Sequence, residues 1–208
     1  KKLKIFWPSS MAVFGPTAPK DQTPQRTILE PTTIYGVTKV AGELLCQYYF
    51  LKYGVDTRSV RFPGIISYET EPVFGTTDYA TAVFYSALRS GQYTCYLKED
   101  TQLPMMYMSD ALKSIFIIMA APAEQLSIRT SYNLAAMSFS PKELVAEINK
   151  HLPLKVSYYP DKRQAIADSW PNSIDDRAAR QDWGFKSDYD LAKLTVIMLE
   201  KLKVKLGL

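Results

Sequence analysis

A strand–helix–strand pattern at the start of the chain is the feature that most constrains its fold. The β-rich runs LKIFW at 3–7 and TRSVRF at 57–62 are separated by a segment with helical periodicity over 31–53. Pro31 is typical of a first helical turn and Gly54 of a helix end. One apolar stripe of the helix is formed by Ile34, Val37, Ala41, Leu44 and Tyr48. Two strands joined by a crossover helix predict an α/β fold with parallel strands.

The rest of the chain continues to alternate helices and short strands. Helices are predicted over about 79–90, 109–121, 141–151 and 188–205, and short strands near YTCYL, MMYM, SYNLA and KVSYY. The segment 63–78 is rich in Pro, Gly and Thr and is longer than an ordinary connection between a strand and a helix. We therefore expect it to be a functional loop.

Composition argues against several classes of protein. The chain has 208 residues, 47% hydrophobic and 22% charged, which suits one large domain or a main domain with a small lobe. Its net charge of +4 is not concentrated in a basic block, so we expect no nucleic-acid partner. Cys46 and Cys95 lack metal-ligand spacing and the chain has one histidine, which predicts free thiols and no metal site. No apolar run reaches about 18 residues, and KKLKIFW lacks the apolar core of a signal peptide, so we expect a soluble protein and no membrane partner.

Tyr35 and Lys39 carry the most specific chemical signal. They stand four residues apart on the predicted helix, so their side chains share one face. A tyrosine phenol is a weak base at neutral pH, and a nearby ammonium group favours its ionised form. Ser10, at the end of the preceding strand, places a hydroxyl where parallel sheets hold their sites. These groups are suited to removing a proton from an alcohol as a hydride leaves its carbon, although an isolated Tyr-x-x-x-Lys spacing is more often a solvated surface pair.

The context of these residues resembles a known family. PSSMAVFG ends the first strand, YGVTKVAGELL opens the helix and VRFPGII lies on the next strand. In this order and spacing they resemble the extended short-chain dehydrogenase/reductase family. The resemblance implies that Ser10, Tyr35 and Lys39 are catalytic, and the spacing to VFG favours Ser10 over Ser9.

NAD is the cofactor that the resemblance implies. Tyr35 and Lys39 would contact it together with a turn made by Phe62, Pro63 and Ile65. Members of the family also carry a strand, a glycine-rich turn and a helix that hold the pyrophosphate, and the nine glycines here do not form that motif. We therefore expect the chain to be the C-terminal portion of a longer enzyme, with the N-terminal cofactor half missing.

This resemblance also sets the expected fold class, the C-terminal part of a Rossmann-type doubly wound parallel sheet with a small α/β substrate lobe. Residues 1–66 are predicted to be the second half of the dinucleotide-binding sheet with the catalytic helix. Residues 67–208 are predicted to be mainly the substrate lobe, with some strands and helices returning to the Rossmann sheet.

Longer strings resemble the L-threonine 3-dehydrogenase branch of that family. They are GTTDYA (75–80), YTCYLKEDTQLPMMYMSDAL (93–112), APAEQLSIRTSYNLAAMSFSP (121–141) and RQAIADSWPNSIDDRAARQDWGF (163–185). The resemblance implies oxidation of the L-threonine 3-hydroxyl, held between Ser10 and Tyr35, with hydride transfer to NAD. The product, 2-amino-3-ketobutyrate, is cleaved in this branch to glycine and acetyl-CoA. The branch also implies a homodimer formed through the helix that carries Tyr35 and the next long helix of the sheet, packed as a four-helix interface. It implies a location in the mitochondrial matrix of a eukaryote and otherwise in the cytoplasm.

Two further segments are expected to bind the substrate. In GTTDYATAVF, Thr76, Thr77 or Asp78 is a plausible N-cap of the next helix, and the same helix start would attract the substrate carboxylate. Asp78 would then face the substrate ammonium or remain a surface cap. Trp170 precedes a proline turn and is expected either to cover an edge of the core or to form a wall of the pocket.

Two alternative functions remain open. A nucleoside-diphosphate-sugar epimerase or dehydratase of the same family would share the serine, tyrosine and lysine. Such relatives usually carry basic side chains for the diphosphate, whereas Pro104, Met105 and Met106 occupy the corresponding segment here. The other alternative is an inactive truncated remnant.

Overall fold

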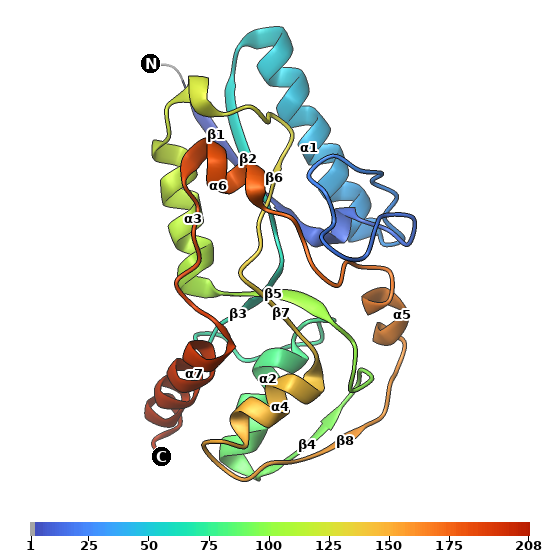
Figure 1. The fold of residues 1–208 in the computed structure, drawn as a ribbon, viewed down its shortest axis with the longest axis vertical. Helices are drawn as coiled ribbons and strands as arrows, with labels where there is room; N and C mark the ends of the chain where they lie inside the picture. Colours follow the sequence, from blue (N-terminus) through green and yellow to red (C-terminus); the bar gives the residue numbers. More distant parts are fainter. Residues whose placement is uncertain (1–2) are drawn as a thin grey trace.

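The computed structural model describes residues 3–208; Lys1 and Lys2, which the predicted division at 1–66 includes, lie outside the described residues. One part of it is a parallel sheet with the order β1-β2-β6, made of β1 (Lys4–Ser10), β2 (Asp56–Phe62) and β6 (Tyr132–Asn133). The helix α1 (Ile34–Tyr53) covers one face of this sheet, and α3 (Met108–Ala120) and α6 (Arg177–Trp183) cover the other (Figure 1). Helices on both faces of a parallel sheet confirm the predicted Rossmann-type α/β fold.

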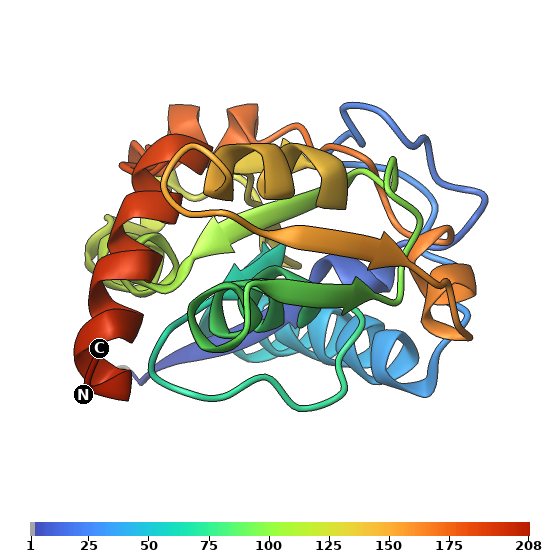
Figure 2. The same ribbon diagram turned by 90° about the horizontal axis from the view of Figure 1, so that it is seen from below.

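The other part of the structure is built from short strands and three helices. Here β3 (Gly64–Ile66) runs parallel to β5 (Leu103–Tyr107), which pairs antiparallel with β7 (Met137–Phe139). Figure 2 shows β4 (Gln92–Cys95) and β8 (Lys155–Tyr158) side by side as a second, parallel pair. The helices α2 (Tyr79–Arg89), α4 (Pro141–Ile148) and α7 (Leu191–Leu206) pack against one another around a core that includes buried Phe84, Phe139 and Met198. Three shorter elements complete the fold: η1 (Met11–Val13), η2 (Ala123–Gln125) and α5 (Arg163–Ala167).

Capping side chains explain where the long helices begin and end. Thr33 has an extended backbone and its hydroxyl accepts a hydrogen bond from the Gly36 N–H at 3.1 Å, so α1 begins at Ile34. The prediction that Pro31 lies in the first helical turn is therefore wrong. Gly54, with φ of 65°, ends the helix as predicted. Likewise the Asp190 carboxylate accepts from the Lys193 N–H at 2.8 Å, which starts α7 at residue 191 rather than 188.

Six elements were not predicted: β3, β7, α5, α6, η1 and η2. Each is between three and seven residues long, too short for a periodic pattern to be distinguished from a loop. Part of the predicted functional loop 63–78 is thus the strand β3, which leaves residues 67–78 between β3 and α2.

Two further findings concern the cysteines and membrane-spanning helices. Cys46 and Cys95 are free and buried, and burial is the main cause that raises the pKa of Cys46 to about 11. Within residues 3–208, no helix has the length and apolar character needed to cross a bilayer.

Candidate active site

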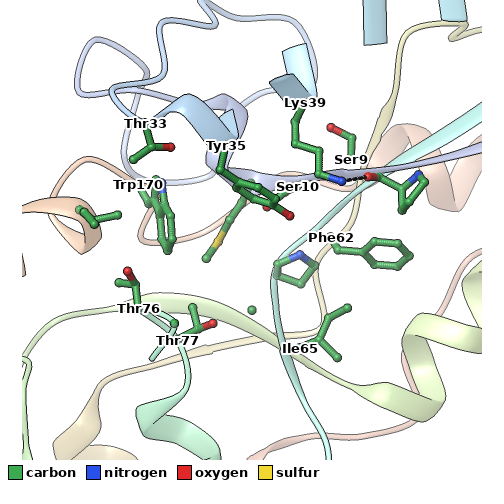
Figure 3. Close-up of a pocket in the computed structure, with 16 residues that line it drawn as sticks. Ser9, Ser10, Thr33, Tyr35, Lys39, Phe62, Ile65, Thr76, Thr77 and Trp170 are labelled. Carbon is green, nitrogen blue, oxygen red and sulfur yellow. Dashed lines mark hydrogen bonds between the residues drawn. The ribbon is translucent and has the colours of Figure 1, made fainter. Parts of the chain in front are cut away.

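A cavity of about 680 Å³ lies at the carboxyl ends of β1 and β2. Its walls come from the end of β1, the start of α1, the turn between β2 and β3, the loop before α2, and α5 with the residues after it. In Figure 3, Tyr35, Ser10 and Lys39 lie above the cavity, Thr76, Thr77 and Ile65 lie below it, and Trp170 lies at one end. The carboxyl edge of a parallel sheet is where α/β proteins bind ligands.

Ser10 is the last residue of β1, opposite Phe62 in the sheet register. Its Oγ accepts a hydrogen bond from the Ala12 N–H at 3.2 Å, which leaves the hydroxyl proton free to be donated into the cavity. The Ser9 hydroxyl is instead committed to the buried carboxylate of Glu43, to which it donates at 2.6 Å. Of the two adjacent serines, Ser10 therefore has the hydroxyl available to a ligand.

Tyr35 and Lys39 occupy the first turns of α1. The Tyr35 side chain is 52% exposed, so its phenol is open to the cavity. The Lys39 Nζ donates to the carbonyl oxygen of Pro8 at 2.6 Å, and it lies 5.0 Å from the ring centroid of Trp7 and 5.3 Å from that of Tyr35. The lysine is thus fixed to the end of β1 with its charge beside the tyrosine ring, and two of its three N–H groups remain for a ligand.

The turn after β2 gives the cavity an apolar wall formed by Phe62, Pro63, Gly64 and Ile65. A β-carbon on Gly64 would lie 2.9 Å from the Cγ2 of Thr77 and closer still to the sulfur of Met105. Only glycine therefore lets Thr77 approach the turn this closely. The apolar turn and the threonine loop are consequently neighbouring walls of one cavity.

Thr76 and Thr77 line the cavity, whereas Asp78 does not. The Asp78 carboxylate accepts hydrogen bonds from the backbone N–H groups of Val73 and Gly75, both at 2.9 Å. It occupies the N-cap position of α2 without making a side-chain capping bond. Asp78 thus holds the expected N-cap position, but its carboxylate binds the loop before α2 rather than the N–H groups of the helix. A contact between Asp78 and the substrate ammonium stays a prediction.

Trp170 forms one end of the cavity. Lys20 holds the backbone around it, since the Lys20 Nζ donates to the carbonyl oxygens of Asp168 at 2.6 Å and Trp170 at 3.0 Å. Burial is the main cause that lowers the pKa of Lys20. Ile166, on the short helix α5, lines the same end and was not predicted.

Sequence reasoning also missed Met11, Thr33 and Gly75 as lining residues. Met11 and Thr33 lie within two residues of Ser10 and Tyr35, so their nearness to these residues in sequence could have identified them. Ile166 had no such signal, because α5 reaches the cavity only through the tertiary fold.

The cavity is rich in hydroxyls and poor in charge. Six of its lining residues carry a hydroxyl group: Ser9, Ser10, Thr33, Tyr35, Thr76 and Thr77. Lys39 is the one charged side chain that lines it among residues 3–208. No cluster of three or more His, Cys, Asp or Glu side chains able to hold a metal ion occurs in that part of the chain. The arrangement can hydrogen-bond a small polar molecule and offers one positive charge.

Comparisons with known proteins agree with this architecture. The model of the NAD dependent epimerase/dehydratase family matches residues 1–135. The mitochondrial L-threonine 3-dehydrogenase of Bos taurus is 53% identical over 199 residues, which are 95% of this chain and 53% of that protein. An uncharacterized epimerase/dehydratase of Staphylococcus haemolyticus is 54% identical over 206 residues, 98% of this chain and 65% of that protein. The chain thus spans about half to two thirds of the length of these curated relatives.

A solved structure is equally similar. The GalE-like L-threonine dehydrogenase from Cupriavidus necator, in its apo form, matches with a TM-score of 0.95 and 53% identity, covering 96% of this chain and 72% of that one. The similarity therefore extends from the sequence motifs to the whole arrangement of strands and helices. On the family match over more than half of its length and these identities, the chain belongs to the NAD dependent epimerase/dehydratase family.

Proposed function

We propose that the protein oxidises the 3-hydroxyl of L-threonine to 2-amino-3-ketobutyrate, with NAD as the hydride acceptor. The observation that carries the proposal is the convergence of Ser10, Tyr35, Lys39 and Thr77 on one cavity with a single lining cation. The similarity to threonine dehydrogenases supports the choice of substrate.

The residues present fit the nicotinamide end of the cofactor. Phe62, Pro63 and Ile65 offer an apolar wall for a flat ring, and Lys39 has free N–H groups for ribose hydroxyls beside the phenol of Tyr35. When bound, NAD supplies the acceptor for the hydride that leaves the substrate carbon. The rest of the cofactor would be bound by other residues.

Three residues then handle the proton and the reacting oxygen. Tyr35 accepts the proton of the 3-hydroxyl, and the Lys39 ammonium lies beside it, 5.3 Å from its ring centroid. Ser10 donates its hydroxyl proton in a hydrogen bond to the reacting oxygen and orients it toward Tyr35. The oxygen stays bonded to C3 and becomes the ketone oxygen, as the hydrogen on C3 leaves as a hydride with the electron pair of the C3–H bond.

Thr76 and Thr77 are proposed to bind the substrate carboxylate. Both side chains line the cavity just before α2, where hydroxyl donors and the positive end of the helix favour an anion. Trp170 and Ile166 close one end of the cavity and limit the size of the substrate while excluding water.

Conversion of a nucleoside-diphosphate sugar is the second candidate, because the matching family includes epimerases and dehydratases. A diphosphate carries at least two negative charges and is usually bound by several cations, whereas Lys39 stands alone among the described lining residues. This charge count favours an amino acid as the substrate.

A direct assay separates the candidates. The full-length protein is incubated with NAD and either L-threonine or a UDP- or GDP-sugar, and NADH formation and sugar conversion are followed. We expect NADH with L-threonine alone. Conversion of a sugar nucleotide without threonine oxidation would refute the proposal, and so would inactivity of the full-length protein with every substrate.

The protein is also proposed to be a homodimer formed through α1. Ile34, Val37, Leu44 and Tyr48, from the predicted stripe, are all between 46% and 80% exposed. Such a row of exposed apolar side chains on one helix is typical of an interface. Light scattering of the full-length protein at micromolar concentration should give the mass of a dimer, and a monomer would contradict the proposal.

A further inference from the structure

A buried charge pair lies directly behind the cavity. Glu43 of α1 and Arg61 of β2 form two parallel hydrogen bonds, from Arg61 Nε to Glu43 Oε1 at 2.9 Å and from Arg61 Nη2 to Glu43 Oε2 at 2.7 Å. The side chains of Glu43 and Arg61 are only 1% and 4% exposed. A two-point contact of this kind fixes both the distance and the orientation of the groups that carry it.

The pair is also tied to the neighbouring strands. The Ser9 hydroxyl of β1 donates to Glu43 Oε1 at 2.6 Å, and Arg61 Nη1 donates to the Asn133 side chain of β6 at 3.1 Å. Ser9, Arg61 and Asn133 are directly opposite one another in the register of the sheet. Glu43 therefore anchors α1 to a continuous polar row across all three strands.

This anchor is close in sequence to every group of the proposed reaction. Ser9 precedes Ser10 on β1, where successive side chains point to opposite faces of the sheet. Tyr35, Lys39 and Glu43 are spaced by four residues and so share one face of α1. A shift of α1 by one residue would rotate this face by about 100° and break both hydrogen bonds of the pair.

We propose that Glu43 and Arg61 are positioning residues that set where α1 lies on β1 and β2, and thereby bring Tyr35 and Lys39 to Ser10. The inference rests on the proposed function, because it assigns a role toward that reaction. Stability alone does not account for the pair, since apolar side chains of similar volume often replace a buried ion pair without loss of stability. Apolar side chains have no directional bonds and would leave the position of α1 less defined.

The decisive variant replaces both charges together, Glu43→Met with Arg61→Met, in the full-length protein. Neither charge is then left buried and alone, but Ser9 and Asn133 each lose a hydrogen-bond partner. We therefore expect cooperative thermal unfolding at a lower temperature than that of the wild type. A displacement of about 1 Å at the reacting groups costs about 100-fold in rate, so kcat should fall by that order. KM for L-threonine should change little, because Thr76 and Thr77 lie on another part of the structure. Wild-type kcat in a stably folded double variant would overturn the proposal.

Asp56→Asn is the matched control. Asp56 binds buried Arg58 at the opposite end of the same strand, with hydrogen bonds of 3.1 Å to Nε and 2.8 Å to Nη2, and neither residue lines the cavity. This variant should unfold at a lower temperature and keep its kcat. An equal loss of kcat in the control would mean that turnover follows general stability, which also overturns the proposal.

Two further measurements cover the remaining outcomes. If the double variant does not fold, Glu43→Gln and Arg61→Lys are judged by the same criterion, a loss of kcat without a matching rise in KM. If the wild type does not oxidise L-threonine, the proposed function fails, and a crystal structure of the double variant tests the positioning role by itself. The Tyr35 hydroxyl should then lie farther from Ser10 by about 1 Å; an unchanged separation would refute the role.

Discussion

Replacing Gly36 by alanine tests how closely the start of α1 must approach η1, which directly follows β1. Gly36 follows Tyr35 and is buried in the first turn of α1 against η1. A β-carbon there would lie 2.5 Å from the Cβ of Pro31 and closer still to the carbonyl oxygen of Ala12. Ordinary contact begins at 3.4 Å, so the added carbon is too near the proline ring by about 0.9 Å. Backbone and proline ring cannot swing aside like a flexible side chain, and therefore the start of α1 must move.

The size of that movement sets the expected effect. A displacement near 1 Å between Tyr35 and Ser10 should lower kcat by about 100-fold, because proton transfer depends on a preformed geometry. Overpacking of this kind typically costs about 1–3 kcal/mol of folding free energy, so the variant should still fold. The loss of turnover is measured by steady-state kinetics with L-threonine, and the loss of stability is measured separately by thermal unfolding.

Gly54→Ala, at the other end of α1, is the control. Gly54 has φ of 65° and no atom within 4 Å of an added β-carbon, so the substitution introduces backbone strain without a collision. The left-handed conformation costs an alanine about 1–2 kcal/mol, so the unfolding temperature should fall while kcat stays unchanged. Wild-type turnover in Gly36→Ala, or an equal loss of turnover in both variants, would refute the reasoning.

Four further predictions test the remaining roles. Tyr35→Phe should lower kcat by about 10²- to 10⁴-fold without altering folding, and Ser10→Ala should reduce turnover more than Ser9→Ala; the reverse order of the serines would reassign the hydroxyl. Thr77→Ala should raise KM for L-threonine by about 10- to 150-fold, the loss of a hydrogen bond to a charged group, with NAD affinity unchanged; a weakened NAD affinity instead would place the cofactor at this loop. The hydrogen bond from the Ser140 N–H is the main cause that lowers the pKa of Glu143 below its ordinary 4.5. The Glu143 carboxylate therefore contributes its full stabilisation above pH 4.5, and this stabilisation is lost as the pH falls through the lowered pKa. Glu143→Gln should therefore destabilise the protein near neutral pH and progressively less in acid, and a loss independent of pH would contradict this assignment.

The fold was predictable where a segment is long and periodic. The β1–α1–β2 unit follows from two β-rich runs and a helix of 20 residues. The helix begins at Ile34 because Thr33 takes the cap, and the strands begin at Lys4 and Asp56 rather than at 3 and 57. The short strands β3 and β7 have three residues each and exist because they pair with β5. A strand that depends on a partner distant in sequence leaves no local pattern.

The candidate site was likewise predictable where its residues lie on long periodic elements and less so where they lie on loops. Ser10, Tyr35 and Lys39 lie on the periodic unit, so their chemistry and spacing predict a common location that the structure also gives them. The opposite wall depends on loops, and there single residues were misjudged. Asp78 was expected to cap α2 or to face a ligand; it holds the N-cap position, but its carboxylate accepts from the loop N–H groups of Val73 and Gly75 instead of making a capping bond.

The buried pair shows a signal that the sequence contains but that pattern matching passes over. Glu43 is the sole acidic residue of α1 and, in AGELL, looks like an ordinary polar position on a helix. Arg61 interrupts β2, a strand whose last six residues are all buried. An arginine buried in such a strand needs an acceptor, because an unpaired buried charge is far too costly. Arg58 finds its carboxylate in Asp56 of the same strand, and Arg61 finds its own in Glu43 of α1. Since α1 connects β1 to β2 and must cover one face, its single carboxylate is the acceptor that the strand requires, and this requirement fixes the rotation of the helix that carries Tyr35.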